Sequence, residues 1–343
     1  MVCGLRSIDD IYDWAKSAPS RKFLQHEFGI TKILSRAQFY NILRLVDAEK
    51  FKLAFTRWMR RALDGGVSGK TIAIDGKTVC STDKLTESKS VLHIASAIVS
   101  DLKLVIGSQE CATKTGEITA FGELIDLLDV SGAMVVADAL HCNQKSAKAV
   151  VEAKANYLFL VKDNVPRLKK DIELFFETEA THTAQTTEKN GGRIETRSAS
   201  AGNEIEWLDG KEKWNNIACI GTIHREFENI KSGKTSKERH FYISSVQLTP
   251  EELLAHARME WAVESMHWLL DVHFSEDKTA VWDMNVQKIL NTTRKIALNL
   301  IRTFRDTHYP KRTPLTSVFK ENIFNLDMLS GFLGYFRSVS KLD

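Results

Sequence analysis

The segment TIAIDGKTV, residues 71–79, determines how this chain can fold. Its β-branched residues and two-residue period are typical of a strand, and the alternation places Ala73, Asp75 and Lys77 on one face. Asp75 would then lie in mid-strand, where a carboxylate has no routine structural role. Burying a carboxylate costs free energy unless it is paired or binds a metal, so Asp75 is a candidate functional residue.

The segments that follow predict an α/β domain. VLHIASAIVS and LKLVIGSQE, residues 91–100 and 102–110, continue an antiparallel meander with short polar joins. Helices and buried strands then alternate: a helix over about 117–128, the strand AMVVAD at 133–138, a helix over about 143–153 and the strand YLFLV at 157–161. The order βββαβαβ is that of a ribonuclease H-like fold, although its alternating half alone would fit many α/β folds.

A polar region from about residue 175 to 247 interrupts this alternation and predicts a β-rich insertion. After a helix near LKKDIELFF, the segments with strand character are GGRIETRSAS, EIEWLDG, IACIGTIHREFE and RHFYISSV. Helical periodicity returns at 250–272 and 286–305, so helices are expected to complete the chain.

The N-terminal residues predict a small domain of three short helices. Ser7 with Asp10 and Ser35 with Gln38 are typical of helix starts, and Asp47 could cap a helix through FKLAFTRWMRRAL. The basic faces of these helices are compatible with a helix-turn-helix-like DNA contact, although small helical domains with other roles are also common. We therefore expect a helical, DNA-binding domain at 1–66 and a catalytic domain at 67–343.

Two further acidic residues have settings like that of Asp75. Asp138 ends a hydrophobic strand at the carboxyl edge, where open α/β sheets bind ligands; alternatively, it could cap the next helix. Glu264 lies in MEWAVESMHWLLD on the helix face that also carries Trp261 and Trp268, and we expect this face to meet the sheet. The alternative for Glu264 is a structural pairing with an arginine.

Three carboxylates without a histidine or thiolate partner suit a hard cation. We expect Asp75, Asp138 and Glu264 to be the catalytic acids and to bind Mg²⁺ or Mn²⁺. Two such ions about 3.5–4 Å apart can activate a water or a DNA 3′-hydroxyl and stabilise the leaving oxygen of a phosphoryl transfer. The pattern therefore predicts nuclease or strand-transfer chemistry. His141 and Cys142, adjacent to one another, are expected to point apart and not to form a nucleophile pair.

The net charge of +3 is unevenly distributed along the 343 residues. Residues 1–70 hold 13 Lys and Arg against 7 Asp and Glu, and residues 281–343 hold 10 against 5. The ends are thus +6 and +5, and the remaining middle is −8. Basic ends around an acidic centre would suit a bound polyanion, although solvated helix faces would give the same counts.

Composition excludes several classes of protein. Five cysteines without CxxC spacing disfavour a disulfide framework or a zinc site. The apolar runs are too short to cross a bilayer, and Met1 is not followed by a signal segment, so a cytoplasmic location without a membrane is expected. The absence of a G-x-x-x-x-G-K-[ST] loop leaves nucleotide hydrolysis unsupported.

Several motifs together resemble one family. IAIDGK, KTGEITAFGELIDLLDVSGAMVVADALHC, YLFLVKDN, GGRIETR and VESMHWLLDVHFSED with RKIALNLIR closely resemble the ISAs1-type, H-repeat-associated transposases of the IS4-like branch of DDE transposases. The similarity covers nearly the whole chain, in the family's order. It implies a ribonuclease H-like core, a β-rich insertion before the last acid, and a catalytic triad of Asp75, Asp138 and Glu264.

The same resemblance implies double-stranded DNA as the partner, both the terminal inverted repeats of an element and its target, held by a homodimer. Basic residues would then contact DNA phosphates. These expected contacts are Lys77, Lys114, Lys162 and Arg193 in the matching motifs, together with Arg258 and Arg294.

The chain departs from the family pattern at a few positions. Glu260 replaces a basic or neutral residue, Ser265 follows Glu264 in place of asparagine, and residues 162–165 lack the usual glycine and glutamine. The first residues correspond to a point partway into the family's N-terminal region. An alternative function is therefore an inactive, degenerate DNA-binding relative, and a third is a nuclease of the same fold that cuts without joining.

Overall fold

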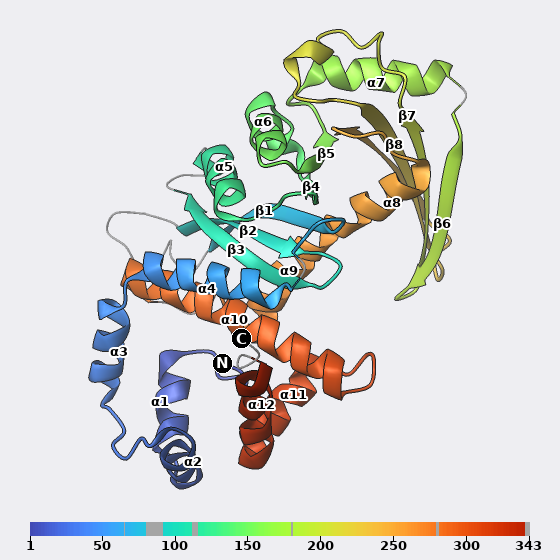
Figure 1. Ribbon diagram of the computed structural model, residues 1–343. Coiled ribbons are helices and arrows are strands. Elements are labelled where there is room, and N and C mark those ends of the chain that lie inside the picture. Colours follow the sequence, from blue (N-terminus) through green and yellow to red (C-terminus); the bar gives the residue numbers. More distant parts are fainter. Residues whose placement is uncertain (65, 80–91, 112–115, 180, 279–280, 340–343) are drawn as a thin grey trace. The chain divides into compact units, whose positions relative to one another are not determined.

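The computed structural model describes residues 1–343 except 65, 80–91, 112–115, 180, 279–280 and 340–343 (Figure 1). The chain forms two compact units. The helical unit comprises Met1–Trp58, Thr78–Leu92 and Met266–Asp343, and the sheet unit comprises Met59–Lys77 and His93–Ser265. Within the described residues, no helix has the length and apolarity needed to cross a membrane.

The described part of the helical unit is built from helices at both ends of the chain. They are α1 (Ile8–Lys16), α2 (Ala18–Phe28), α3 (Arg36–Leu45), most of α4 (Ala48–Ala62), the end of α9 (Trp261–Phe274), α10 (Met284–His308), α11 (Leu315–Phe324) and α12 (Leu326–Val339), with α9 shared between the units.

The helix starts predicted in the N-terminal region are confirmed. Ser7 with Asp10 and Ser35 with Gln38 form capping boxes, and Asp47 Oδ1 accepts a hydrogen bond of 3.0 Å from Lys50 N. The region holds four helices where three were expected, because an additional cap at Ser17 begins α2 directly after α1. Side-chain caps thus set the helix boundaries here.

The N-terminal helices pack with C-terminal ones. Ile8 shares a buried cluster with Val281, Val286 and Leu290, against which Phe39 of α3 also packs. The division of the chain into two compact units therefore differs from the domain boundary expected at residue 66. The reason is that the apolar faces of α1 and α3 are covered by residues more than 200 positions later in the chain.

The sheet unit is built on one nine-stranded sheet in the order β3-β2-β1-β4-β5-β9-β8-β7-β6. The strands are β1 (Thr71–Val79), β2 (Leu92–Val99), β3 (Leu104–Cys111), β4 (Met134–Ala137), β5 (Asn156–Val161), β6 (Thr183–Asn190), β7 (Arg193–Gly202), β8 (Cys219–Asn229) and β9 (Thr235–Ser244). Its helices are α5 (Glu117–Leu127), α6 (Gln144–Glu152), α7 (Pro166–Thr178), α8 (Pro250–Met259) and the start of α9.

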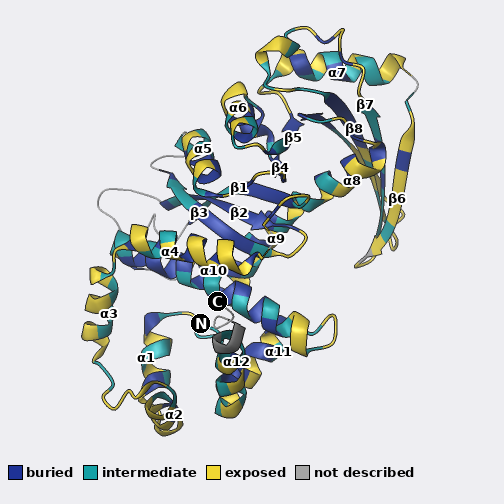
Figure 2. Ribbon diagram, viewed as in Figure 1, coloured by how far each residue is buried: buried dark blue, intermediate teal, exposed yellow. Residues whose placement is uncertain are grey.

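The first five strands confirm the predicted ribonuclease H-like core. β2 and β3 are antiparallel, whereas β1, β4 and β5 are parallel neighbours. The chain passes from β1 to β4 through β2, β3 and α5, and from β4 to β5 through α6. β4 and most of β5 are buried, as expected for apolar strands between layers of helices (Figure 2). The register of this order brings the carboxyl end of β4 beside the middle of β1.

The β-rich insertion extends this sheet. β9 pairs antiparallel with β5, and β8, β7 and β6 follow in turn. The strand expected at EIEWLDG is wrong: residues 204–210 form turns, and Gly210 at φ 76° occupies the left-handed region. β6 was not predicted, because its sequence TAQTTEKN is almost entirely polar.

Two glycines let helices approach opposite faces of the insertion. A Cβ on Gly202 of β7 would lie 2.7 Å from Phe175 of α7, and one on Gly221 of β8 would lie 2.5 Å from Leu253 of α8. Gly221 pairs with Ala201, the neighbour of Gly202, so the two glycines face opposite sides of the sheet. α8 is thereby fixed on the face of β7 and β8 away from α7 (Figure 1).

We expect Gly221→Ala to lower the free energy of unfolding by about 1–3 kcal/mol, because the added methyl group overpacks a buried contact. Urea denaturation followed by circular dichroism measures this. Gly122→Ala in α5 is the control, since nothing lies within 4 Å of its added atom. An equal response of the two variants would contradict the close contact of α8 with β8.

Candidate active site

The register of two parallel strands places Asp75 beside Asp138. β1 pairs with β4 from Thr71 opposite Met134 to Ile74 opposite Ala137. The next residues along the two strands are Asp75, still within β1, and Asp138, just past the end of β4, so the two carboxylates lie side by side where β4 ends.

Asp138 also caps the turn that follows it. Its Oδ1 accepts a hydrogen bond of 3.1 Å from the backbone N–H of Leu140, at the start of a short 3₁₀ turn at Ala139–His141. The capping role considered from the sequence is therefore present, and Asp138 lines the pocket as well. The cap fixes the direction in which this carboxylate leaves the strand.

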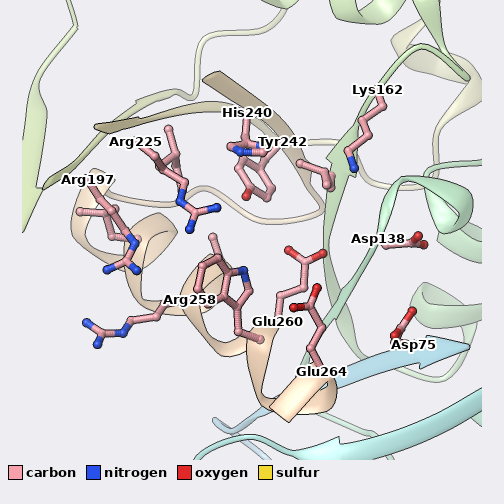
Figure 3. A pocket seen from close by; sticks show the side chains of 15 residues that line it. Asp75, Asp138, Lys162, Arg197, Arg225, His240, Tyr242, Arg258, Glu260 and Glu264 are labelled. Carbon is pink, nitrogen blue, oxygen red and sulfur yellow. The ribbon is translucent and has the colours of Figure 1, made fainter. Parts of the chain in front are cut away.

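Glu264 reaches the same pocket from the other side, on α9 (Figure 3). The expectation that its helix face is buried against the sheet is wrong. Trp268 is 59% exposed, and the buried face of α9 carries Val263, Met266 and Leu270 instead. The aromatic residues at helical spacing predicted the wrong buried face of α9. The residues that form the core lie one position before Glu264, at Val263, and two positions after it, at Met266.

A fourth acidic residue, Glu260, lies between α8 and α9. α8 ends at Met259 and α9 begins at Trp261, so Glu260 occupies the break between the helices. Glu260, Glu264, Asp138 and Asp75 all line one pocket of about 290 Å³ (Figure 3).

The acidic residues of this pocket repel one another. Burial, with repulsion from Asp138, Glu117 and Glu264, raises the pKa of Asp75 to about 7. Burial, with repulsion from Asp138, Glu264 and Asp75, raises the pKa of Glu260 to about 7 despite the opposing charge of Lys162. Such excess negative charge is typical of sites that bind cations or transfer protons.

Basic residues of the insertion line the opposite side of the pocket. Arg197 of β7 and Arg225 of β8 occupy opposite positions in the register, with His240 and Arg258 on the same side of the pocket, whereas Lys162 lies beside Asp138 (Figure 3). Glu195 holds both arginines, at 2.6 Å from Arg197 and 2.9 Å from Arg225. Two like charges directly opposite on a sheet are unfavourable unless a counter-charge bridges them, and Glu195 supplies it.

Trp261 joins the acidic and basic sides. The guanidinium of Arg225 lies 4.2 Å from the centroid of its ring and that of Arg197 lies 5.7 Å away. Because the ring remains 42% exposed, Trp261 orders the arginines while staying at the surface of the pocket.

Residues 67–300 match the family model described as "Transposase DDE domain". This match covers more than half of the chain. The chain belongs to the DDE transposase family. The predicted resemblance to H-repeat-associated DDE transposases and the ribonuclease H-like fold are thereby confirmed.

Relatives of this DDE transposase carry similar names. "Putative transposase YncI" of Escherichia coli O157:H7 is 31% identical over 270 residues, covering 76% of this chain and 69% of that protein. "H repeat-associated putative transposase YhhI" of Escherichia coli strain K12 is 29% identical, covering 76% and 71% respectively. The solved "Cryo-EM structure of piggyBac transposase synaptic complex with hairpin DNA (SNHP)" aligns with 98% of this chain and 69% of that one, at 13% identity and a TM-score of 0.43.

DDE transposases generally use divalent metal ions, and the acidic residues here fit such an ion in chemistry and charge. All of the candidate ligands are hard oxygen donors, and their mutual repulsion would be relieved by a cation. Among the residues that the structure describes, however, no three acidic, histidine or cysteine side chains are gathered closely enough to hold a metal. Binding would therefore require the carboxyl groups to draw together.

The residues expected to contact DNA lie in different environments. Lys162 and Arg258 line the pocket, and Arg258 pairs with Glu188 at 2.5 Å. Lys77 follows Asp75 on β1, half-buried, and Arg193 begins β7, exposed and outside the pocket. Lys114 lies outside the described residues.

The predicted DNA contact of Arg294 is contradicted by its burial. The side chain is 3% exposed within α10, and its charge interacts with Glu276, Asp277 and Asp271. Lys295 and Arg302 of the same helix are also buried, so three of the ten basic residues counted in 281–343 do not reach the surface.

The sequence analysis did not identify two basic residues of the pocket, Arg197 and Arg225. The two-residue period of β7 places Arg193, Glu195 and Arg197 on one face, which could have indicated Arg197. Arg225 could be found only from the pairing of β7 with β8, which the sequence does not specify. Cys142 is buried, and this burial raises the pKa of its thiol to about 12, which disfavours the thiolate form that a nucleophile requires.

The raised pKa of Asp75 predicts a pH-dependent stability without metal. Between about pH 4 and 7 the folded protein retains a proton that the unfolded chain has lost. Wild type therefore loses stability relative to Asp75→Asn as the pH rises, by roughly 4 kcal/mol in all. Urea denaturation in EDTA at several pH values measures the difference.

Asp163→Asn is the control for this series. The hydrogen bond from Lys169 lowers the pKa of the exposed Asp163, so the ionised Asp163 stabilises the folded protein. This stabilisation grows as the pH rises through the ordinary range of carboxylate pKa values, which is opposite in sign to the effect of Asp75. A wild-type advantage over Asp75→Asn that grows with pH would contradict the repulsion among the acidic residues.

Proposed function

We propose that this transposase binds the ends of an insertion sequence and catalyses metal-dependent DNA cleavage and strand transfer with Asp75, Asp138 and Glu264. The observation that carries this proposal is the register of β1 with β4, which brings the first two acids together in a pocket that also contains the third. The family match supplies the reaction class.

Each side of the pocket has its own part in the proposed reaction. The three acids would hold Mg²⁺ or Mn²⁺, two ions in our proposal, which when bound supply Lewis acidity and lower the pKa of a water or a 3′-hydroxyl. Arg197, Arg225 and Lys162 are placed to attract the phosphates of a DNA strand and to hold its backbone across the acidic side.

The proposed partners are the terminal inverted repeats and a target duplex, held by a homodimer with one active site for each end. A helical, DNA-binding region at 1–66 remains part of this proposal, as do DNA contacts from Lys77, Lys114 and Arg193.

One observation favours a second candidate, a catalytically inactive DNA-binding relative. Glu260 adds a fourth negative charge to the pocket at a position where the family pattern has a basic or neutral residue. This charge opposes the approach of a phosphate. The two candidates differ in whether the protein breaks DNA strands in the presence of a metal.

We expect Asp75→Asn to abolish Mg²⁺-dependent cleavage and joining of element ends, because a metal ligand is lost, while DNA affinity in EDTA is retained. A gel assay with labelled element ends measures both. Asp126→Asn, an exposed carboxylate of α5, is the matched control. Cleavage by Asp75→Asn at the wild-type rate would refute the proposal, and cleavage by neither protein would favour the inactive relative.

We expect Arg225→Gln to weaken DNA binding for all sequences alike and to reduce the slope of log affinity against log salt by about one, because one phosphate contact is lost. Fluorescence anisotropy at several salt concentrations measures the slope. Lys148→Gln, an exposed cation of α6 outside the pocket, is the control. An unchanged slope for Arg225→Gln would remove this arginine from the proposed DNA path.

A further inference from the structure

The carboxyl group of Glu117 lies against the backbone of β1 directly after Asp75. A Cβ built on Gly76 would overlap this carboxyl group, so glycine is required at position 76 for Glu117 to occupy its place. The repulsion that Glu117 exerts on Asp75 is consistent with this proximity. Glu117 begins α5, far from Gly76 in sequence, and its side chain is 13% exposed.

The partner of Glu117 is His141, which belongs to the turn that Asp138 caps. His141 Nε2 lies 3.4 Å from Glu117 Oε1, and the imidazole is wholly buried. The ring stacks on Phe121, one turn further along α5, with centroids 4.3 Å apart. Neither ring nitrogen makes a hydrogen bond within the described residues, so the approach of Glu117 is a close polar contact.

The two residues therefore connect the segments that carry the first two acids. Glu117 contacts the residue after Asp75, and His141 lies three residues after Asp138. Burying a carboxylate and an imidazole costs free energy that a single polar contact offsets only in part. This costly contact lies beside two acids whose separation determines whether a cation fits, which points to a role in holding that separation.

We propose that Glu117 and His141 form a positioning pair, which ties the β1 segment at Asp75 to the turn after Asp138 and so sets the spacing of the two carboxylates. The consequence for metal binding rests on the proposed function, whereas the mechanical coupling of the two segments does not. Groups behind metal ligands commonly change affinity by about tenfold to a hundredfold when altered.

Gly76→Ala is the most direct variant, because it alters no ionisable group. The added methyl group displaces the end of a flexible side chain and does not strike backbone, so the fold should tolerate it. Glu117→Gln and His141→Phe, which keeps the ring stacked on Phe121, break the pair from either side. Gly122→Ala and Glu123→Gln on the same helix are the matched controls.

Hydrogen–deuterium exchange in EDTA tests the coupling without any metal. We expect Gly76→Ala, Glu117→Gln and His141→Phe each to accelerate exchange about tenfold in both 71–79 and 138–143, with 156–161 of β5 unchanged. Acceleration in only one of the two segments, or equally in β5, would overturn the proposal, because the pair would then be a local or a general stabilising contact.

Binding of Mn²⁺, followed by electron paramagnetic resonance, tests the consequence. We expect the three variants to weaken binding about tenfold or more, and the two controls to bind as wild type does. Weaker binding by Glu117→Gln with wild-type binding by His141→Phe would overturn the pairing and make Glu117 a direct ligand. If wild type binds no Mn²⁺, the proposed function fails, and the exchange experiment still decides whether the pair couples the segments.

Discussion

The parallel pairing of β1 with β4 is the constraint on which the site depends. Ile74 opposite Ala137 is the last matched position of the two strands, and the chain continues from there into Asp75 and Asp138. A shift of one residue in this register would move one carboxylate to the other face of the sheet. The buried apolar residues of both strands oppose such a shift, so core packing fixes the position of the acids.

The nine-stranded sheet also determines what faces those acids. Because β9 pairs with β5, the insertion continues the same sheet, and Arg197 and Arg225 are carried on its strands to the pocket. The close contact of α8 with β8 at Gly221 fixes the helix that leads to Glu260 and Glu264. Acidic and basic sides are thus both held by backbone pairing and close packing.

The sequence predicted those parts of the fold that depend on local periodicity. The alternation in TIAIDGKTV, the apolar strand before Asp138 and the caps at Ser7 and Ser35 each reflect interactions within a few residues. Long-range packing decided the rest. Residues 204–210 alternate like a strand but turn at Gly210, and Arg225 acquires its place only through pairing with β7.

In the proposed reaction, Asp75, Asp138 and Glu264 together hold the catalytic metal. Anomalous diffraction from a crystal of the protein with an element end and Mn²⁺ tests this arrangement. We expect anomalous density within about 2.5 Å of carboxylate oxygens of all three residues, a distance typical of bound divalent cations. Density held by other side chains, or none in this pocket, would contradict it.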